Sequence, residues 1–177
     1  MATETKHHIL SVLMENRFGV LTRISGLFAR RGFNINSLAV SETEDPNFSR
    51  MTIVVEADTT PLEQVTKQLH KLIPVIKITE ITTGEGVERE LMLVTAHASA
   101  ESRHQITDLA NIVGAQVIEV GHDEVTLSLA GEPAQLDSLT DLLRPHGIVE
   151  LQRTGCIALP KLDRQSPKLR AVKSKSA

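Results

Sequence analysis

Residues 15–38, which read ENRFGVLTRISGLFARRGFNINSL, contain the features that decide the fold of the first half of the chain. After Gly19, apolar residues recur at the spacing of one face of a helix: Val20, Leu21, Ile24, Leu27 and Phe28. Arg30 and Arg31 complement the dipole at the end of that helix, and Gly32 is a natural left-handed stop. The stretch therefore predicts a glycine turn, one amphipathic helix and the start of a strand at Asn34 and Ile35.

The flanking segments complete a recognisable unit. Alternating apolar residues predict four strands, at 7–14, 35–43, 51–57 and 75–81. In the first of them, Ile9, Val12 and Leu13 are the expected core residues. Pro61 opens a second helix, which ends before Pro74. The order is strand, helix, strand, strand, helix, strand, which is the split β-α-β arrangement of ferredoxin-like folds.

The second half repeats this order after a linker at 84–88. Strands are predicted at 91–94, 116–120 and 125–129, helices at 100–112 (capped by Ser99) and from Pro133 through Leu143, and a closing strand at 148–157. We therefore expect an α+β chain with two tandem ferredoxin-like βαββαβ domains, over 1–83 and 89–160. Each sheet would have open edges, and edge-to-edge pairing between subunits or halves would cover them.

Composition restricts the classes of function. Hydrophobic residues make up 41% of the chain, but Trp and Tyr are absent and only four Phe occur, so the cores must be aliphatic. The single cysteine, Cys156, excludes an internal disulfide framework, suits a reducing cytosol, and is expected to be a small buried residue in a strand. No apolar stretch approaches the length of about 18 residues that a membrane span needs. We expect a cytoplasmic protein.

The net charge of −3 is distributed unevenly along the chain. Residues 161–177 carry six basic residues against Asp163 alone, and the chain before them is acidic. An acidic globular body argues against nucleic acid as the main ligand. We expect the tail to be disordered, with weak electrostatic contact to a partner as the alternative.

The turn at Gly19 is the candidate small-molecule site. Free N–H groups at the start of a helix bind a carboxylate, and a glycine lets the ligand approach the backbone. Asn16 and Asn34 offer donors and acceptors for the ammonium and carboxylate of a free amino acid. The alternative is structural: Gly19 makes a turn, Asn16 makes an Asx-turn and Asn34 begins a strand. Local pattern alone favours that alternative.

Other chemistry finds little support in the sequence. The seven histidines show no spacing typical of a metal site, and no paired carboxylates stand apart from solvated helix faces. An RNA-binding ferredoxin-like domain would stack bases on aromatic residues of its sheet. Phe33 and Phe48 lie only at strand margins. No catalytic constellation is found.

Several long segments, in order, carry a family resemblance. They read ILSVLMEN, GVLTRISGLFARRGFNINSLAVSETED, SRMTIVVEAD, LEQVTKQLHKLIPVIKITEI and VERELMLV. From about Ile9 to Gly155 the chain closely resembles the regulatory (small) subunit of acetolactate synthase, also called acetohydroxyacid synthase. The first half then resembles an ACT domain, a ferredoxin-like module that commonly binds amino acids, and the second half the family's own C-terminal domain.

The resemblance implies a chain without catalysis of its own, in branched-chain amino acid biosynthesis. The partner would be a separate catalytic subunit that carries thiamine diphosphate, Mg²⁺ and FAD. The small subunit would activate it and confer feedback inhibition by valine, bound where two ACT domains of a homodimer meet. Carried over by motif, the effector-binding residues would be Asn16, Gly19, Val20, Leu21, Asn34 and Ile35, with Thr22 and Ser41 as supporting residues.

The chain departs from the family pattern at two places. Thr95-Ala96-His97 replaces a more usual basic residue, and the tail after Leu159 diverges. Neither touches the effector motif, but both bear on subunit contacts made by the second half. The alternative function is an ACT-type amino-acid sensor that regulates a different enzyme. The long second half favours the acetolactate synthase hypothesis, because a stand-alone sensor does not need it.

Overall fold

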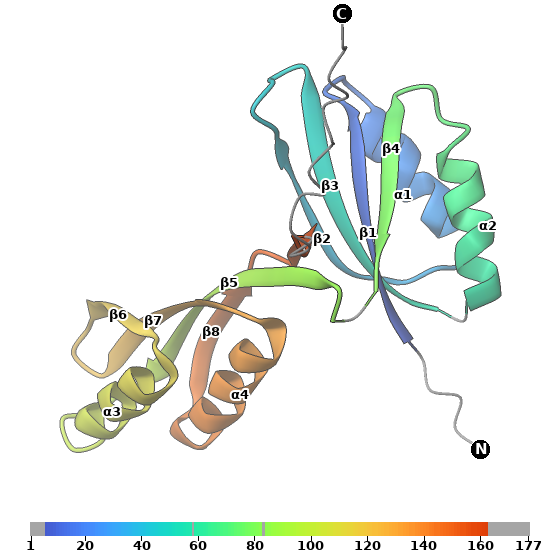
Figure 1. Ribbon diagram of the computed structural model, residues 1–177. Coiled ribbons are helices and arrows are strands. Elements are labelled where there is room, and N and C mark those ends of the chain that lie inside the picture. The colour runs from blue at the N-terminus through green and yellow to red at the C-terminus, as the bar shows by residue number, and fades with distance from the viewer. Residues whose placement is uncertain (1–5, 58, 83, 163–177) are drawn as a thin grey trace, which may run out of the picture.

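The computed structural model describes residues 6–57, 59–82 and 84–162, which fold as two α+β units joined by a long strand (Figure 1). Each unit is an antiparallel sheet covered on one face by two helices. The predicted pair of ferredoxin-like units is confirmed. Within the described residues, no helix is long and apolar enough to cross a membrane.

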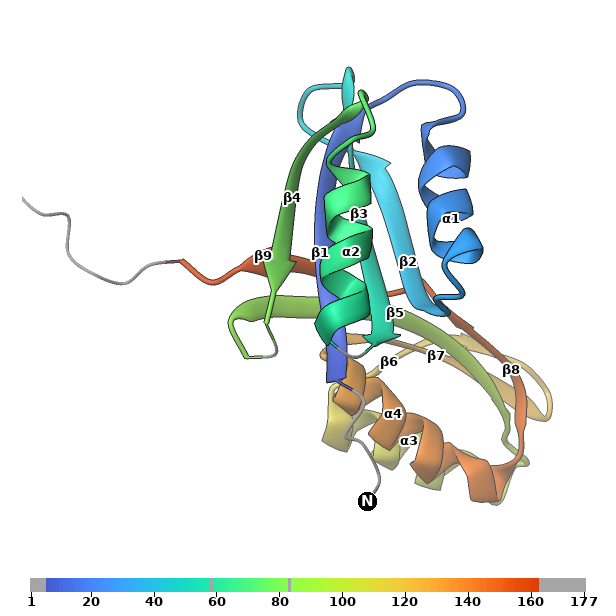
Figure 2. The same ribbon diagram turned by 90° about the vertical axis from the view of Figure 1, so that its right-hand side faces the viewer.

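The first unit has the strand order β2-β3-β1-β4. Its elements are β1 (Lys6–Glu15), α1 (Val20–Arg30), β2 (Ile35–Glu42), β3 (Phe48–Ala57), α2 (Thr59–Leu69) and β4 (Val75–Ile81). Helices α1 and α2 lie side by side on one face of this sheet (Figure 2). Strand β2 is an edge strand, and within the described residues β3 is the only strand that pairs with it.

Helix α1 is held by the apolar stripe that the sequence indicates. Val20, Ile24, Leu27 and Phe28 are buried against the sheet. Phe28 also meets the ring of Phe33 edge-on, with centroids 6.3 Å apart. Gly32 has φ of 73°, the left-handed conformation that ends the helix with little strain.

Strand β1 shows the two faces of this sheet. Leu10, Val12 and Met14 point to the helices and are buried in the main core. Ile9 and Leu13 point to the other face, and Leu13 remains partly exposed. The prediction of Leu13 as a core residue was therefore wrong, because the alternation assigns the helix-covered face to the even-numbered positions.

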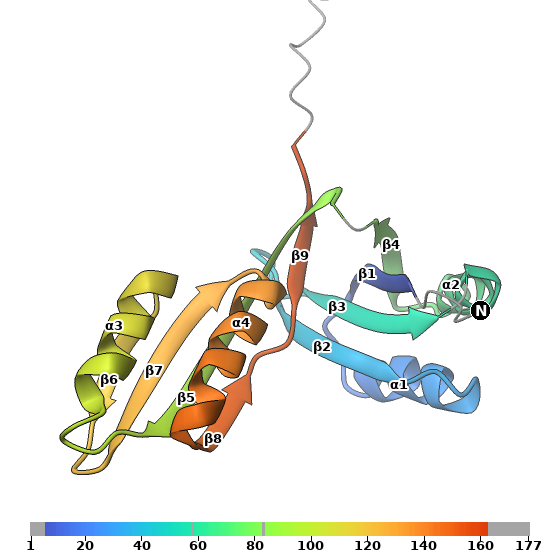
Figure 3. The ribbon, with the colours of Figure 1, turned by 90° about the horizontal axis from the view of Figure 1, so that it is seen from below.

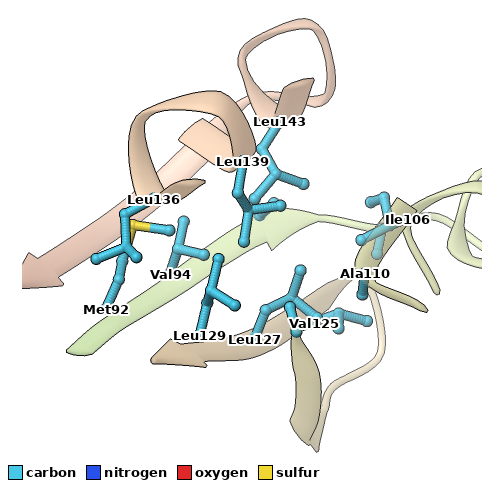
Figure 4. Packing of buried hydrophobic residues seen from close by; sticks show 13 residues of the cluster. Met92, Val94, Ile106, Ala110, Val125, Leu127, Leu129, Leu136, Leu139 and Leu143 are labelled. Carbon is cyan, nitrogen blue, oxygen red and sulfur yellow. The ribbon is translucent and has the colours of Figure 1, made fainter. Parts of the chain in front are cut away.

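The second unit has the strand order β6-β7-β5-β8. Its elements are β5 (Gly86–His97), α3 (Arg103–Val113), β6 (Gln116–Val120), β7 (Glu124–Gly131), α4 (Pro133–Leu143), the short 3₁₀ helix η1 (Arg144–His146), β8 (Ile148–Arg153) and β9 (Ile157–Pro160). Its core is aliphatic, with Leu136 and Leu139 of α4 packed over Met92 and Val94 of β5 (Figure 4).

Strand β9 joins the two units. It pairs antiparallel with Gly86–Arg89 at the start of β5, and it lies across the helix-free face of the first sheet (Figure 3). There Ala158 is buried with Ile9 and Ile81, and Val54 packs against this cluster. The single closing strand predicted at 148–157 was wrong. The chain turns at Thr154–Cys156, where Gly155 has φ of 85°, and begins a new strand.

Several predicted boundaries shift, and strand β3, predicted from 51, begins at Phe48. Helix α2 begins at Thr59, so Pro61 lies inside its first turn. Helix α3 begins at Arg103 because Ser99 forms a separate turn, in which its Oγ accepts the N–H of Ser102 at 3.3 Å. Residues 86–88, expected in the linker, belong to β5 because they have β9 as a partner. The predicted tail falls outside the described residues from 163 onward.

Candidate effector site

Gly19 forms the open turn that precedes α1. Its φ of 81° is left-handed, and no side chain caps the helix. A Cβ built at Gly19 would meet no heavy atom within 4 Å, so the space in front of the backbone is empty. The first N–H groups of a helix point outward and carry the positive end of its dipole. This turn is therefore chemically suited to receive a carboxylate.

The surface beside this turn is open. Val20 is buried, but Leu21 is 41% exposed and Thr22 is also exposed. Phe18 projects fully into solvent. A shallow groove of about 720 Å³ runs along the outer face of α1, lined by Phe18, Gly19, Thr22, Arg23, Gly26, Ala29 and Arg30.

Asn16 is already held in place by two hydrogen bonds. Its Nδ2 donates to Oε1 of Glu42 at 3.0 Å and to the backbone oxygen of Pro46 at 3.0 Å. Both partners are acceptors, which fixes the orientation of the amide. Its Oδ1 is therefore left to accept a hydrogen bond. In this arrangement Asn16 suits the ammonium group of an amino acid rather than its carboxylate.

Asn34 and Ile35 lie at the opposite end of α1, where β2 begins. An 11-residue helix is roughly 16 Å long. Asn34 is exposed, and Ile35 is partly buried against the core. The structure thus brings together Asn16, Gly19, Val20, Leu21 and Thr22. It does not bring Asn34 and Ile35 to them within one chain.

The far end of β2 returns to the Gly19 turn. Glu42, the last residue of β2, binds Asn16, and Ser41 precedes it on the exposed edge strand. Glu42 and the Pro46 carbonyl are residues of the site that sequence reasoning missed. The only signal was the turn chemistry of residues 44–47, which does not reveal a partner for Asn16.

A second polar cluster lies at the junction of the two units. Arg153 donates through Nη2 to Glu90 at 2.5 Å and through Nη1 to Asp137 at 2.6 Å. The Glu90 side chain is only 7% exposed. The hydrogen bond to Glu90, assisted by the one to Asp137, raises the pKa of Arg153 despite partial burial of its guanidinium. The cluster anchors the end of β8 to β5 and α4.

The described residues show no other arrangement of reactive side chains that would support catalysis. Burial raises the pKa of the Cys156 thiol to about 11, with the charges of Glu88 and Glu90 adding to the effect. Cys156 is buried, as predicted, but it lies in the turn between β8 and β9 rather than in a strand. Over residues 6–57, 59–82 and 84–162, no three His, Cys, Asp or Glu residues are grouped as a metal site.

Comparison with known proteins agrees with this architecture. Residues 10–77 match a family described as the AHAS small subunit-like ACT domain, and residues 89–162 match the small subunit of acetolactate synthase. The acetolactate synthase small subunit of Mycolicibacterium smegmatis is 47% identical over 161 residues, which cover 91% of this chain and 95% of that protein. The chain belongs to the acetolactate synthase small-subunit family.

Two further members of the small-subunit family extend the comparison. A probable acetolactate synthase small subunit of Archaeoglobus fulgidus is 49% identical over 152 residues, covering 86% of this chain and 95% of that protein. The crystal structure of the acetolactate synthase small subunit of Thermotoga maritima superposes with a TM-score of 0.83 at 34% identity. It covers 89% of this chain and 99% of that one. Both halves of the chain therefore belong to the shared small-subunit architecture.

Proposed function

We propose that this chain is the regulatory subunit of acetolactate synthase, which binds and activates the catalytic subunit and confers feedback inhibition by valine in branched-chain amino acid biosynthesis. The observation that carries the proposal is the open Gly19 turn beside the edge strand β2, in a chain of this family. The chain itself would be non-catalytic and cytoplasmic. Thiamine diphosphate, Mg²⁺ and FAD would reside on the catalytic subunit.

The geometry of β2 supports a site shared by two chains. Within one chain, β2 runs from Ile35, at the end of α1, back to Glu42, which binds Asn16 at its start. If two copies of β2 paired antiparallel about a two-fold axis, the Ile35 end of one would lie beside the Glu42 end of the other. The partner's Asn34 and Ile35 would then complete the site at Gly19.

Most of the predicted residues have a role in such a site. The N–H groups after Gly19 would hold the carboxylate of valine, and Oδ1 of Asn16 would accept from its ammonium group. Leu21 and the partner's Ile35 would contact the isopropyl group, while Val20 is buried and keeps the helix in place. Thr22 and Ser41 flank this region as exposed hydroxyl groups.

Regulation by such a site requires two arrangements of the small subunit. Valine shifts their populations only if it binds one arrangement more tightly than the other. The coupling is reciprocal in binding, so the catalytic subunit would alter valine affinity by the same factor. A dimeric site meets this requirement, because it changes whenever the two chains move relative to each other.

Reconstitution tests the proposal. The purified chain is mixed with an acetolactate synthase catalytic subunit, and acetolactate formation is recorded with and without valine, leucine and isoleucine. We expect higher activity with the small subunit and inhibition by valine. Amino-acid binding without any effect on acetolactate synthase would instead support a sensor of a different enzyme. No activation and no valine response would contradict the proposal.

A further inference from the structure

One hydrogen bond joins the edge strand of the first unit to the backbone of the second. The N–H of Cys156, in the turn between β8 and β9, donates to Oγ of Ser37 on β2 at 2.6 Å. Ser37 lies two residues after Ile35 on the strand that begins with the predicted effector residues. Ser37 and Cys156 are far apart in the sequence, so this hydrogen bond depends on how the two units are placed relative to each other.

The backbone around this bond is tightly packed. Gly155 has φ of +85°, and a Cβ there would lie 3.0 Å from both the Leu38 carbonyl oxygen and Ser37 Oγ. Contacts at 3.0 Å are closer than ordinary van der Waals contacts, so a side chain would push β2 away. Strand β2 and the 154–156 turn are therefore in direct contact, with no flexible side chain between them.

The turn is also fixed on its other side. The Thr154 N–H donates to the Leu91 carbonyl at 3.0 Å, and Arg153 is bound to the buried Glu90. Both acceptors belong to β5, the central strand that carries the second sheet. A displacement of β2 at Ser37 would therefore pass through the turn into the second unit.

The start of β2 pairs irregularly with β3 beside Ser37. The pairing shifts register between Ile35 and Ser37, so Asn36 is the extra residue of a bulge. A bulge interrupts the ladder and leaves one residue unpaired. Ser37 is therefore the first regularly paired residue after the irregular segment that carries Asn34 and Ile35, and a displacement of that segment acts on Ser37 directly.

We infer that the Ser37–Cys156 hydrogen bond is an interdomain latch that couples the state of the effector site to the position of the second unit. This inference rests on the proposed function, since it assumes an effector at Asn34 and Ile35. The latch is closed in this structure. Effector held between two chains pulls on the start of β2, and the altered position of Ser37 loosens the latch.

Amide exchange measures the latch without any catalytic partner. In the ligand-free chain, the Cys156 N–H is expected to exchange at least about tenfold more slowly than in Ser37→Ala, because that variant lacks the acceptor. Ser37→Thr keeps a hydroxyl group and restores slow exchange. Ser128→Ala removes a half-buried serine of β7, a strand that pairs with β5 and β6 but not with β2, β8 or β9, and serves as the control. Equal rates in wild type and Ser37→Ala would overturn the latch.

Valine then tests the coupling. Adding valine to the wild type is expected to accelerate exchange of the Cys156 N–H, whereas the same addition to Ser37→Ala leaves it unchanged. In the reconstituted enzyme, Ser37→Ala should bind valine more tightly than the wild type does, as measured by calorimetry, because in the wild type part of the binding energy opens the latch. Its half-inhibitory concentration should change by about two- to tenfold, the share of one neutral hydrogen bond.

The outcomes separate the two proposals. A wild type that neither binds valine nor responds to it contradicts the proposed function and removes the effector from this inference. A wild type that is inhibited by valine, together with Ser37→Ala inhibited identically, leaves the proposed function standing and overturns the latch. A half-inhibitory concentration that changes by about two- to tenfold in Ser37→Ala and returns to the wild-type value in Ser37→Thr supports the latch.

Discussion

Asn16 and Glu42 are joined by a 3.0 Å hydrogen bond that ties the end of β1 to the end of β2. The bond sits at the Gly19 turn, where α1 begins. It makes the edge strand and the Gly19 turn one structural unit. In the proposed site, a molecule bound at the turn would therefore act on the edge at which a second copy is proposed to pair.

The first prediction concerns the amide of Asn16. In Asn16→Ala, the side chain no longer donates to Glu42 or to the Pro46 carbonyl, and the Oδ1 acceptor is lost. We expect valine affinity to fall by about tenfold, or roughly 1.4 kcal/mol, as measured by calorimetry. Asn111→Ala, at an exposed position of α3, is the control. Unchanged affinity in Asn16→Ala would exclude Asn16 from the site.

The second prediction concerns the Gly19 turn. Gly19→Asp puts a carboxylate where the ligand's own would bind, and like charges repel. We expect loss of valine inhibition in the reconstituted enzyme, while activation of the catalytic subunit remains. Gly114→Asp is a matched control, because Gly114 also has a positive φ (76°) and empty space in front of its backbone. Equal loss of activation and inhibition in Gly19→Asp would mean that the turn is structural.

The third prediction concerns the buried ion cluster. Arg153→Met leaves Glu90 buried without its partner, so we expect a loss of about 3 kcal/mol in the free energy of unfolding. Arg144→Met breaks only an exposed pair with Asp141 and should cost less than about 1 kcal/mol. Urea denaturation measures both. Similar losses in the two variants would show that Glu90 is not dependent on Arg153.

The fourth prediction concerns the Cys156 thiol. Its pKa of about 11 means that little thiolate exists at pH 8, so we expect slow reaction with thiol reagents until urea unfolds the chain. Between the ordinary value near 9.0 and about 11, the unfolded state loses this proton first. Stability should therefore fall as pH rises through this window. Thermal melts of wild type and Cys156→Ala compare this loss, and identical pH profiles would contradict it.

The sequence was most informative where one local pattern determined one element. The stripe from Val20 to Phe28 and the stop at Gly32 predicted α1 correctly, because a helix face and a left-handed glycine leave marks in adjacent residues. The two repeated units followed from the order of such patterns. The prediction of Leu13 as a core residue was wrong because alternation shows that a strand has two faces but not which face the helices cover.

Features that depend on distant partners left no local signal. The break at Gly155 and the separate strand β9 exist because residues 157–160 pair with the start of β5 and cover the first sheet. For the same reason, the sequence alone does not reveal Glu42 as the partner of Asn16. The candidate effector residues divide in the same way, since Asn16 and Gly19 are local to one turn, whereas their association with Asn34 needs a second chain.

The burial of Ala158 against Ile9 and Ile81 affects how the chain folds during its synthesis and how a truncated fragment of it would behave. On the ribosome, the first sheet emerges long before the strand that covers its second face, so that face waits uncovered until nearly the whole second half is synthesised. A fragment that ends at the apparent domain boundary would keep this apolar strip open to solvent. Strand β9, the last strand of the described residues, thus completes the cover of the sheet that is synthesised first.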